Sequence, residues 1–525
     1  MSDAPSTDTS SSELEMHGYV LGQHNVRPFG LDLHNPVFFV SGLVIVGFVL
    51  VVLAFQAEAS AALKALRPWL TTTFDWVFMI AANIFVLFCL FLIVSPYGKI
   101  RLGGADAKPE YSYSGWFAML FAAGMGIGLM FFGVLEPVYH FQNPPLGVDP
   151  NATEAARTIG MAATIFHWGL HPWAIYAVVA LALAFFCYNR GLPLTIRSAF
   201  YPIFGKATWG WPGHIIDILA VFATLFGLAT SLGIGANQAA GGMKYLFGIP
   251  DTNGVKVLLI CGITTIALIS VLRGLEGGVK RLSEINMLLA LILLLFVIFT
   301  GPTLEIVAGF FTNIADYVVA LPELSNWIGR TDEKFMHGWT TFYWAWWISW
   351  SPFVGMFIAR VSKGRTVREF IICVLIIPTI VGVLWMTAFG GTAVSQFVND
   401  GYTGVTETIK AWTPELSLFK MLEHLPLTQI TSFIGIVLVI VFFVTSSDSG
   451  SLVIDSITAG GKIDAPVSQR VFWATFEGLV AIALLLGGGL ASLQAAAIST
   501  GLPFAIVLVL MCVSIFMGLR KEKRA

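Results

Sequence analysis

The sequence predicts an all-α integral membrane protein with twelve transmembrane helices. Of its 525 residues, 56% are hydrophobic and only 11% are charged, which excludes an ordinary soluble protein. Apolar runs of roughly 20 residues, the length needed to cross the hydrocarbon layer, recur along the chain. These runs lie at 36–55, 74–94, 113–132, 158–186, 213–240, 255–272, 284–300, 339–359, 371–389, 428–446, 471–488 and 501–518.

The basic residues predict the orientation of these spans. When both termini are placed in the cytoplasm, most lysines and arginines fall in segments that face inward, as the positive-inside rule requires. Residues 1–15 contain no basic region ahead of a short apolar core, so a cleaved signal peptide is not expected. The net charge of −2 gives no indication of a nucleic-acid partner.

Two spans contain residues that interrupt helices. The third carries glycine at 124, 126 and 128, and the eighth carries Ser351-Pro352 followed by Gly355. Counted from these two, spans three to seven and eight to twelve form two blocks of five, a pattern typical of an inverted-repeat transporter. The alternative is that these glycines and this proline mark two unrelated kinks, because both residue types are common in membrane helices.

Tryptophan is concentrated in the eighth span. Five of the sixteen tryptophans lie between Trp339 and Trp350, whereas an interfacial belt needs only one or two per span end. Trp344, Trp347 and Trp350 share one helix face. Because the face of an indole ring attracts quaternary ammonium groups, this cluster indicates a site for an organic cation.

The fourth span provides further aromatic rings. Trp168, Trp173 and Tyr176 would face one cavity if the helix were distorted at Pro172. Such a stripe alone is more often a packing feature, but together with the tryptophan cluster it favours a cage. The glycine break would add free backbone N–H groups for a carboxylate and free carbonyls for Na⁺. A zwitterion with a methylated nitrogen fits both halves.

Other polar groups are less informative. Hydroxyls at the end of the tenth span suit Na⁺, although such groups are more often bonded back to their own helix. The chain contains no metal-binding histidine motif, phosphate loop or convincing nucleophile–base pair, which argues against a membrane enzyme. Solvated or capping roles are expected for the ionisable residues near span ends, namely Asp75, Glu136, His167, His171, Asp217 and Glu477.

Together these features resemble the betaine/choline/carnitine transporter family over about residues 35–518. The residues that carry the resemblance are Gly124-Met125-Gly126-Ile127-Gly128 running on to Glu136-Pro137, the segment from His167-Trp168 to Tyr176, the segment from Phe342 to Gly355, and the segment from Gly364 to Phe370.

The resemblance implies a fold and an assembly. The fold would be the sodium–leucine transporter-type 5+5 inverted repeat, preceded by two extra helices. Members are typically homotrimers in the bacterial inner membrane, with an amphipathic helix near 304–320 at the trimer contact. The implied organisation is a cytoplasmic tail (1–35), two peripheral helices (36–112), the first repeat (113–300), an extracytoplasmic helix and loop (301–338), the second repeat (339–518) and a short basic cytoplasmic tail (519–525).

The resemblance also assigns a substrate site. The implied ammonium cage is Trp168, Trp173, Tyr176 and Trp347, with Trp350 lining the path inward. The backbone facing the carboxylate would be that of Gly124, Met125, Gly126 and Gly128. The implied gating aromatics are Phe342, Phe357 and Trp346.

Na⁺ is the coupling ion that the resemblance implies. Its first site maps to Ala122, Met125, Phe442, Thr445 and Ser446. A second site would include Thr224 and Phe353, but a threonine expected four residues after Thr224 is Leu228. The sodium stoichiometry therefore stays open.

Two departures from the family bear on function. Choline-transporting relatives often carry aspartate where this chain has Gly128, which favours a zwitterion over choline. The tail after the last span lacks the long basic helix of osmosensing members. We therefore expect an Na⁺-coupled importer of glycine betaine that works by alternating access. The alternatives are choline, carnitine, ectoine or dimethylsulfoniopropionate as substrate, proton-coupled or sodium-independent transport, and a channel or membrane receptor.

Overall fold

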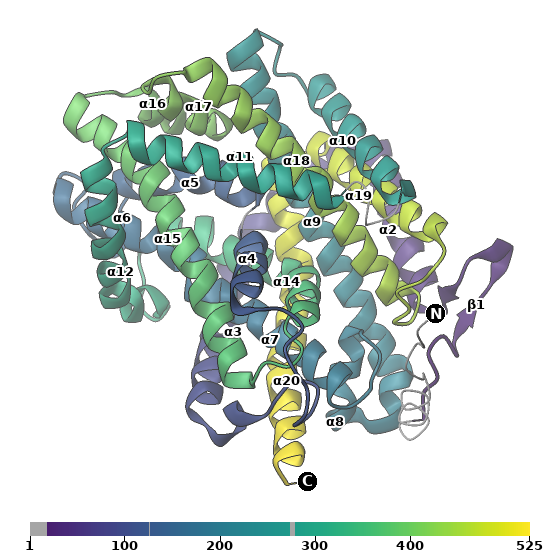
Figure 1. Cartoon of the computed structure of the whole chain (residues 1–525). Coiled ribbons are helices and arrows are strands. Elements are labelled where there is room, and N and C mark those ends of the chain that lie inside the picture. Colours follow the sequence, from purple (N-terminus) through teal and green to yellow (C-terminus); the bar gives the residue numbers. More distant parts are fainter. Residues whose placement is uncertain (1–17, 125, 274–278, 525) are drawn as a thin grey trace, which may run out of the picture.

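The structure is a computed structural model that describes residues 18–124, 126–273 and 279–524. The described chain is almost entirely helical, as predicted (Figure 1). A short antiparallel hairpin, β1 (Asn25–Val26) and β2 (Leu33–His34), precedes the helices. The helices of the first half are α2 (Val37–Ala54), α3 (Gln56–Val94), α4 (Tyr113–Gly124), α5 (Ile127–Gln142), α6 (Thr153–Trp168), α7 (Leu170–Tyr188), α8 (Tyr201–Phe204), α9 (Trp211–Phe247), α10 (Asn253–Arg273) and α11 (Val279–Thr300).

The second half continues the bundle. Its helices are α12 (Thr303–Ser325), α13 (Glu333–Phe335), α14 (Thr341–Val361), α15 (Val367–Asp400), α16 (Gly404–Ala411), α17 (Ser417–Glu423), α18 (Thr428–Thr458), α19 (Val467–Leu486) and α20 (Leu490–Arg524). A π-helical turn, Met336–Thr340, leads into α14. Short 3₁₀ turns, among them Ile196–Phe200 and Gly205–Trp209, connect several of the others.

Among the described residues, 11 helices are long and apolar enough to cross a membrane. This number differs from the predicted twelve at three places. The third span is divided into α4 and α5, and α14 is not counted because its tryptophans, serines and proline lower its mean hydropathy. Conversely, α12 was predicted to lie on the outer surface, but it has the length and composition of a span and adds one to the number. The division into two inverted repeats stays a prediction.

The third span is broken at the glycines, as predicted. Helix α4 ends at Gly124 and α5 begins at Ile127, with Gly126 in an extended conformation between them. Met125, predicted to face the substrate carboxylate and to bind Na⁺, lies outside the described residues. The break leaves backbone N–H and C=O groups at the two helix ends without helical partners.

The fourth span is broken as well, at Gly169 and not at Pro172. Gly169 adopts φ −100° and ψ −129° between α6 and α7. Pro172 lies in the first turn of α7, where proline removes no helical hydrogen bond. A Cβ atom at residue 169 would lie 2.7 Å from the carbonyl oxygen of Ile165, so the chain turns where only glycine fits.

The predicted interruption of the eighth span is wrong. Helix α14 runs without a break through Pro352. Proline cannot donate to the carbonyl of Ile348 one turn earlier, but the Ser351 hydroxyl donates to this carbonyl at 2.7 Å. The side chain thus replaces the missing backbone donor, which is how membrane helices tolerate proline.

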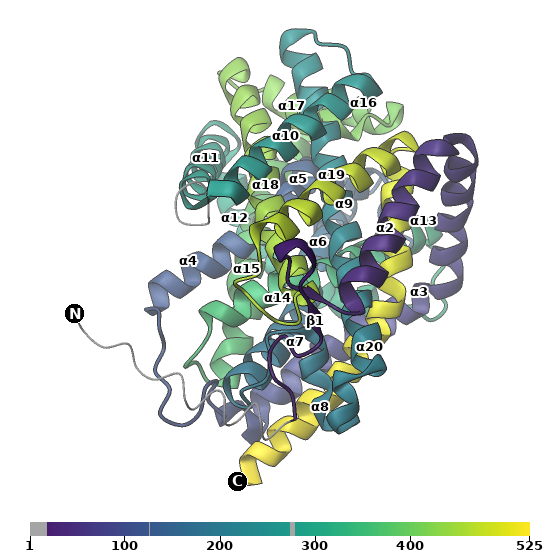
Figure 2. The ribbon, with the colours of Figure 1, turned by 90° about the vertical axis from the view of Figure 1, so that its right-hand side faces the viewer.

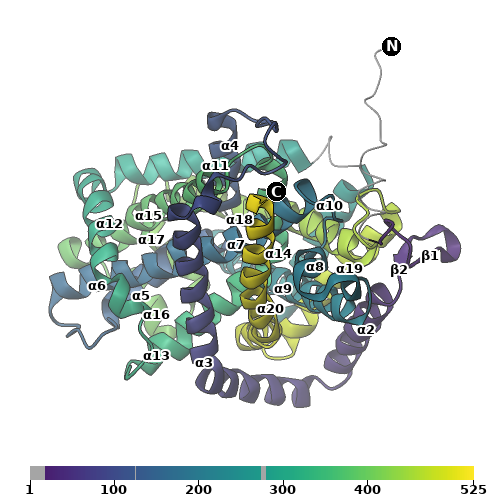
Figure 3. The ribbon, with the colours of Figure 1, turned by 90° about the horizontal axis from the view of Figure 1, so that it is seen from below.

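Helix α14 lies at the centre of the bundle. It packs against α7, α9 and α20 (Figure 1). Helix α7 is buried on all sides, as expected for a central helix, whereas only 28% of the span in each of α10 and α11 is buried. Helices α2 and α3 lie on one flank and α4 on another (Figure 2). Seen from below, α2 and the start of α3 curve around the edge of the bundle (Figure 3).

Candidate functional site

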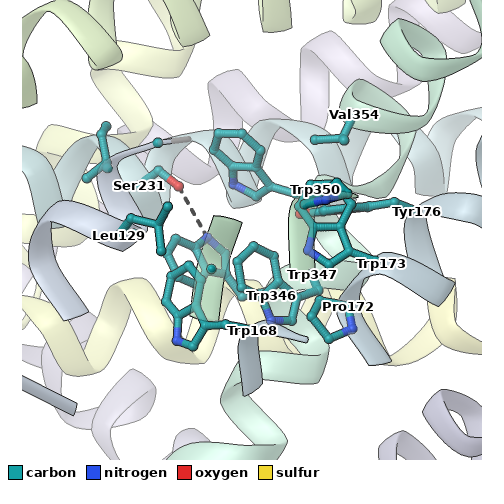
Figure 4. A pocket seen from close by; sticks show the side chains of 15 residues that line it. Leu129, Trp168, Pro172, Trp173, Tyr176, Ser231, Trp346, Trp347, Trp350 and Val354 are labelled. Carbon is teal, nitrogen blue, oxygen red and sulfur yellow. Dashed lines mark hydrogen bonds between the residues drawn. The ribbon is translucent and has the colours of Figure 1, made fainter. Parts of the chain in front are cut away.

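A cavity lies in the centre of the bundle, beside the break between α4 and α5 (Figure 4). Its volume is about 60 Å³. The lining residues are Gly126, Ile127, Gly128, Leu129, Trp168, Pro172, Trp173, Tyr176, Ser231, Trp346, Trp347, Trp350, Val354, Pro378 and Gly382. The four predicted cage residues are therefore brought together, with Trp350, Gly126 and Gly128.

The cage rings meet at steep angles. The ring centroids of Trp168 and Trp347 are 5.0 Å apart with an interplanar angle of 83°. Tyr176 meets Trp347 at 5.9 Å and 88°, and Trp173 meets Tyr176 at 5.3 Å and 74°. Rings arranged edge to face form the walls of a box and not a closed stack.

The polar edges of four indole rings at the cavity are bonded to protein groups. Each of these Nε1–H groups donates to an acceptor of the protein, and one of the acceptors, Ser231, itself lines the cavity. The bonds are Trp168 to Glu136 Oε2 (2.8 Å), Trp347 to the carbonyl of His167 (2.9 Å), Trp350 to the carbonyl of Gly227 (3.0 Å) and Trp346 to Ser231 Oγ (3.2 Å). The apolar ring surfaces are therefore what the cage offers to a ligand.

One polar group of the cage stays available. The hydroxyl of Tyr176 is buried and has no hydrogen-bond partner among the described protein atoms. A buried hydroxyl without a partner costs free energy, so a ligand or water that accepts this hydrogen bond is favoured at the cavity wall.

Gly128 permits the close approach of the cage rings. A Cβ atom at this position would lie 2.6 Å from Cη2 of Trp168 and 3.2 Å from Cη2 of Trp346. The aspartate expected in choline-type relatives would therefore displace Trp168. Gly124 is the last residue of α4.

The three proposed gating residues lie along one stripe of α14. Phe342 lines a separate cavity of about 240 Å³ with Tyr139, Trp339 and Arg67. Its ring stacks on Trp346 at 5.5 Å and 15°, and Trp346 lines the cage itself. Phe357 lies beyond the other end of the cage, in a third cavity of about 250 Å³.

This third cavity contains most of the predicted first sodium site. It is lined by Ala122, Phe442, Thr445 and Ser446, together with Phe353. The Thr445 hydroxyl is 3.1 Å from the carbonyls of Val441 and Phe442, so it is bonded back to its own helix, the alternative that the sequence left open.

The predicted second sodium site stays a prediction. Thr224 is buried and donates to the carbonyl of Ala220 at 2.7 Å. It does not line the cavity that contains Phe353.

Of the six ionisable residues for which solvated or capping roles were expected, only Asp75 is partly exposed, whereas Asp217 accepts the backbone N–H of Arg197 at the start of the 3₁₀ turn Ile196–Phe200. Glu136, His167, Asp217 and Glu477 are completely buried, and His171 is 2% exposed. Asp217 pairs with Arg197 at 3.0 Å, whereas Asp75 keeps partial exposure and lies 3.2 Å from His337. Span ends inferred from hydropathy do not show which polar residues other helices cover.

One cluster of potential metal ligands lies behind the cage. One ligand atom each of Glu136, His140 and His167 lies within 4.8 Å of the others, and no other such group of three occurs among the described residues. Both oxygens of Glu136 already accept hydrogen bonds from protein donors, including the indole of Trp168. The donor set thus favours a hydrogen-bonded network over metal binding.

Several lining residues were not predicted as site residues. Among them are Leu129 of α5, Ser231 of α9, Val354 of α14, and Pro378 and Gly382 of α15. No local sequence pattern marks them as site residues.

Comparison with known proteins places the chain in a family. The family described as betaine/carnitine/choline family transporters (BCCT) matches residues 36–524. The chain belongs to this family. It is therefore a multi-pass membrane protein of a bacterial transporter family, and not an enzyme.

Several relatives are similar over nearly the full length. A glycine betaine/proline/choline transporter of Vibrio parahaemolyticus is 60% identical over 96% of this chain and 94% of its own. Glycine betaine transporter 1 of the same organism is 57% identical over 96% of this chain and 97% of its own. A glycine betaine/proline/choline/ectoine transporter from that organism is 52% identical over 97% of this chain and 91% of its own.

Proposed function

We propose that this transporter imports a methylated zwitterion by alternating access and that import is coupled to Na⁺. Glycine betaine is the preferred candidate substrate. The observation that carries the proposal is the box of aromatic rings over the break between α4 and α5. A trimethylammonium group placed there contacts several ring faces at once, and each contributes about 0.5–2 kcal/mol when desolvated.

The other end of the substrate is a carboxylate. None of the described residues that line the cavity is acidic, so a bare cation would find no counter-charge in the wall. A zwitterion brings its own. Its carboxylate can accept from the Tyr176 hydroxyl and from backbone N–H groups freed at Gly126.

The cavity that collects Phe442, Thr445 and Ser446 supports Na⁺ as the coupling ion, because hydroxyl and carbonyl oxygens are hard ligands. One Na⁺ that enters down a potential of about 100 mV supplies about 2.3 kcal/mol. This free energy sustains roughly 50-fold accumulation of the solute, since each 1.4 kcal/mol is a factor of ten.

Uptake into proteoliposomes tests the proposal. With an inward Na⁺ gradient, labelled glycine betaine should accumulate above its outside concentration, and replacing Na⁺ by K⁺ should abolish accumulation. Equal uptake in both ions would contradict sodium coupling and favour a proton-coupled carrier or an exchanger. Equilibration without accumulation would indicate a channel, and binding without uptake a receptor.

Choline and proline form a second set of candidate substrates, because the relative at 60% identity is described as a transporter of glycine betaine, proline and choline. Competition of labelled betaine uptake by choline, proline, carnitine, ectoine and dimethylsulfoniopropionate separates them. The absence of acidic side chains among the described lining residues favours betaine over choline in this competition.

A homotrimer in the bacterial inner membrane, with both termini in the cytoplasm, is part of the proposal. Its basis is the resemblance to the family. Helix α12 has an apolar face on which Leu304, Val307, Phe311 and Val318 are each more than half exposed, and this face would contact lipid in a monomer and a neighbouring subunit in a trimer. Native mass spectrometry of the detergent-solubilised protein tests the trimer.

A further inference from the structure

We infer that Glu136 is a positioning residue that holds the rings of the aromatic cage in place through one buried carboxylate. The inference rests on the proposed function, because it concerns the same cage. Glu136 belongs to α5, other residues of which line the separate cavity that contains Phe342. Glu136 does not line the cage cavity. It acts on a substrate only through other residues.

The Glu136 carboxylate is completely buried and accepts three hydrogen bonds. Its Oε2 accepts from the indole Nε1–H of Trp168 at 2.8 Å and from the hydroxyl of Tyr343 at 2.5 Å. Its Oε1 lies 2.5 Å from Nδ1 of His167. An ionised carboxylate is an acceptor only, with two oxygens and about four lone pairs, so it can receive all three donors.

His167 connects the Glu136 carboxylate to Trp347, on the other side of the cage. The backbone carbonyl of His167 accepts the indole Nε1–H of Trp347 at 2.9 Å. The His167 ring is stacked on Tyr343, with centroids 4.7 Å apart and an angle of 22°. Its Nε2 lies 2.9 Å from the hydroxyl of Thr340. The ring is thus held on two edges and one face.

The tautomer of His167 follows from these partners. A carboxylate cannot donate, so Nδ1 carries the hydrogen that Oε1 of Glu136 accepts, and in the neutral ring Nε2 then accepts from the Thr340 hydroxyl. Every group of the link has a matching donor or acceptor. Such fully connected buried networks fix side-chain geometry.

One carboxylate therefore joins three helices at the cage. Glu136 comes from α5, Trp168 and His167 from the end of α6, and Tyr343 and Trp347 from α14. In the structure Trp168 and Trp347 meet at 83° with both indole N–H bonds made. The expected loss on breaking the network is cage geometry, and with it substrate affinity.

A double-mutant cycle tests the inference. Glu136→Gln has one amide oxygen in place of two carboxylate oxygens, so it cannot accept all three donors. Trp168→Phe keeps an aromatic ring but removes the N–H donor. In proteoliposomes each single variant should raise KM for glycine betaine about tenfold, with Vmax within about twofold of wild type. Because both variants alter the same hydrogen-bonded network, the double variant should raise KM by less than the product of the two single effects.

The matched control is Glu477→Gln. Glu477 is also a completely buried carboxyl within a helix of the bundle, and it lines neither the cage nor the sodium cavity. Its variant reports the general effect of removing a buried carboxyl, and its KM should stay at the wild-type value.

Several outcomes would overturn the inference. They are an unchanged KM in Glu136→Gln, single effects that multiply in the double variant, or lost thermal stability and Vmax with an unchanged KM. If Glu136→Gln does not reach the membrane, Tyr343→Phe removes one donor and keeps the carboxylate, and KM should rise about threefold; no rise overturns the inference. Wild-type protein that takes up no onium solute would instead contradict the proposed function.

Discussion

At the scale of single residues, the cage depends on where the edges of its rings point. Trp347 donates its N–H to a backbone carbonyl, so its apolar face borders the cavity. Helical spacing placed this residue on one face with Trp344 and Trp350, and the family resemblance assigned it to the cage. The sequence did not predict the role of Glu136, whose partner Tyr343 is 207 residues away along the chain.

Replacing Trp347 by leucine tests the cage at this scale. The leucine side chain keeps apolar contact but has no ring quadrupole, so KM for glycine betaine should rise about tenfold or more. The measurement is uptake into proteoliposomes, with trimer assembly checked by native mass spectrometry and expected to survive. Trp76→Leu, on an exposed tryptophan of α3, is the control. Normal betaine affinity in Trp347→Leu would refute the cage assignment.

Gly128 provides a second test at the residue scale. Alanine at this position would place a methyl group 2.6 Å from Trp168, so the ring must move and betaine uptake should fall about tenfold. Gly262→Ala is the matched control, because a Cβ atom at residue 262 meets no atom within 4 Å. Full uptake by Gly128→Ala, measured beside the control, would show that the ring contact is not needed.

At the scale of elements, proline and glycine act differently in neighbouring helices. The glycine segment ends α4, because glycine readily adopts the non-helical backbone conformation that the break requires. Pro352 does not end α14, because a neighbouring hydroxyl replaces the lost donor. A sequence pattern shows that a donor is missing, but not whether a side chain in the folded helix supplies it.

Ser351→Ala should destabilise α14. It leaves the carbonyl of Ile348 without a donor, and a buried unsatisfied carbonyl costs about 1–3 kcal/mol. Thermal unfolding in detergent should show a lower midpoint for this variant. Ser351→Ala combined with Pro352→Ala restores a backbone N–H and should recover the midpoint. If the double variant is no more stable than the single one, the hydroxyl does not have this role.

At the scale of the whole molecule, the N-terminal hairpin is tied to segments from the end of the chain. Tyr19 donates its hydroxyl to the carbonyl of Gly460, 441 residues away. Asp32 pairs with Lys462 at 2.5 Å, and Gln469 donates to the Asp32 carbonyl. The hairpin thus holds the connection between α18 and α19.

The docking of this hairpin should weaken in acid. Burial lowers the pKa of His34 from 6.5 to about 2, and nearby Arg197, His214 and His24 contribute to this lowering. The docked ring stays neutral, whereas the released ring binds a proton below about pH 6.5. Docking therefore loses stability as pH falls through this value, by about 1.4 kcal/mol per unit.

Hydrogen exchange measures this effect. Amides of residues 19–34, corrected for intrinsic exchange rates, should be less protected at pH 5.5 than at pH 7.5. In His34→Leu the difference between the two pH values should shrink. Equal protection at both pH values in the wild-type protein would contradict the expected linkage.

The sequence by itself determined the membrane class, the broken third span and the tryptophan cluster of the eighth span. These depend on run length, glycine spacing and helical periodicity, which are local properties of a chain. The assignment of individual cage residues came from the family resemblance. Only the tertiary structure decided that α14 is continuous, that the fourth span turns at Gly169 and that Glu136 joins three helices. These features depend on hydrogen bonds and steric contacts between groups that come together only when the helices pack.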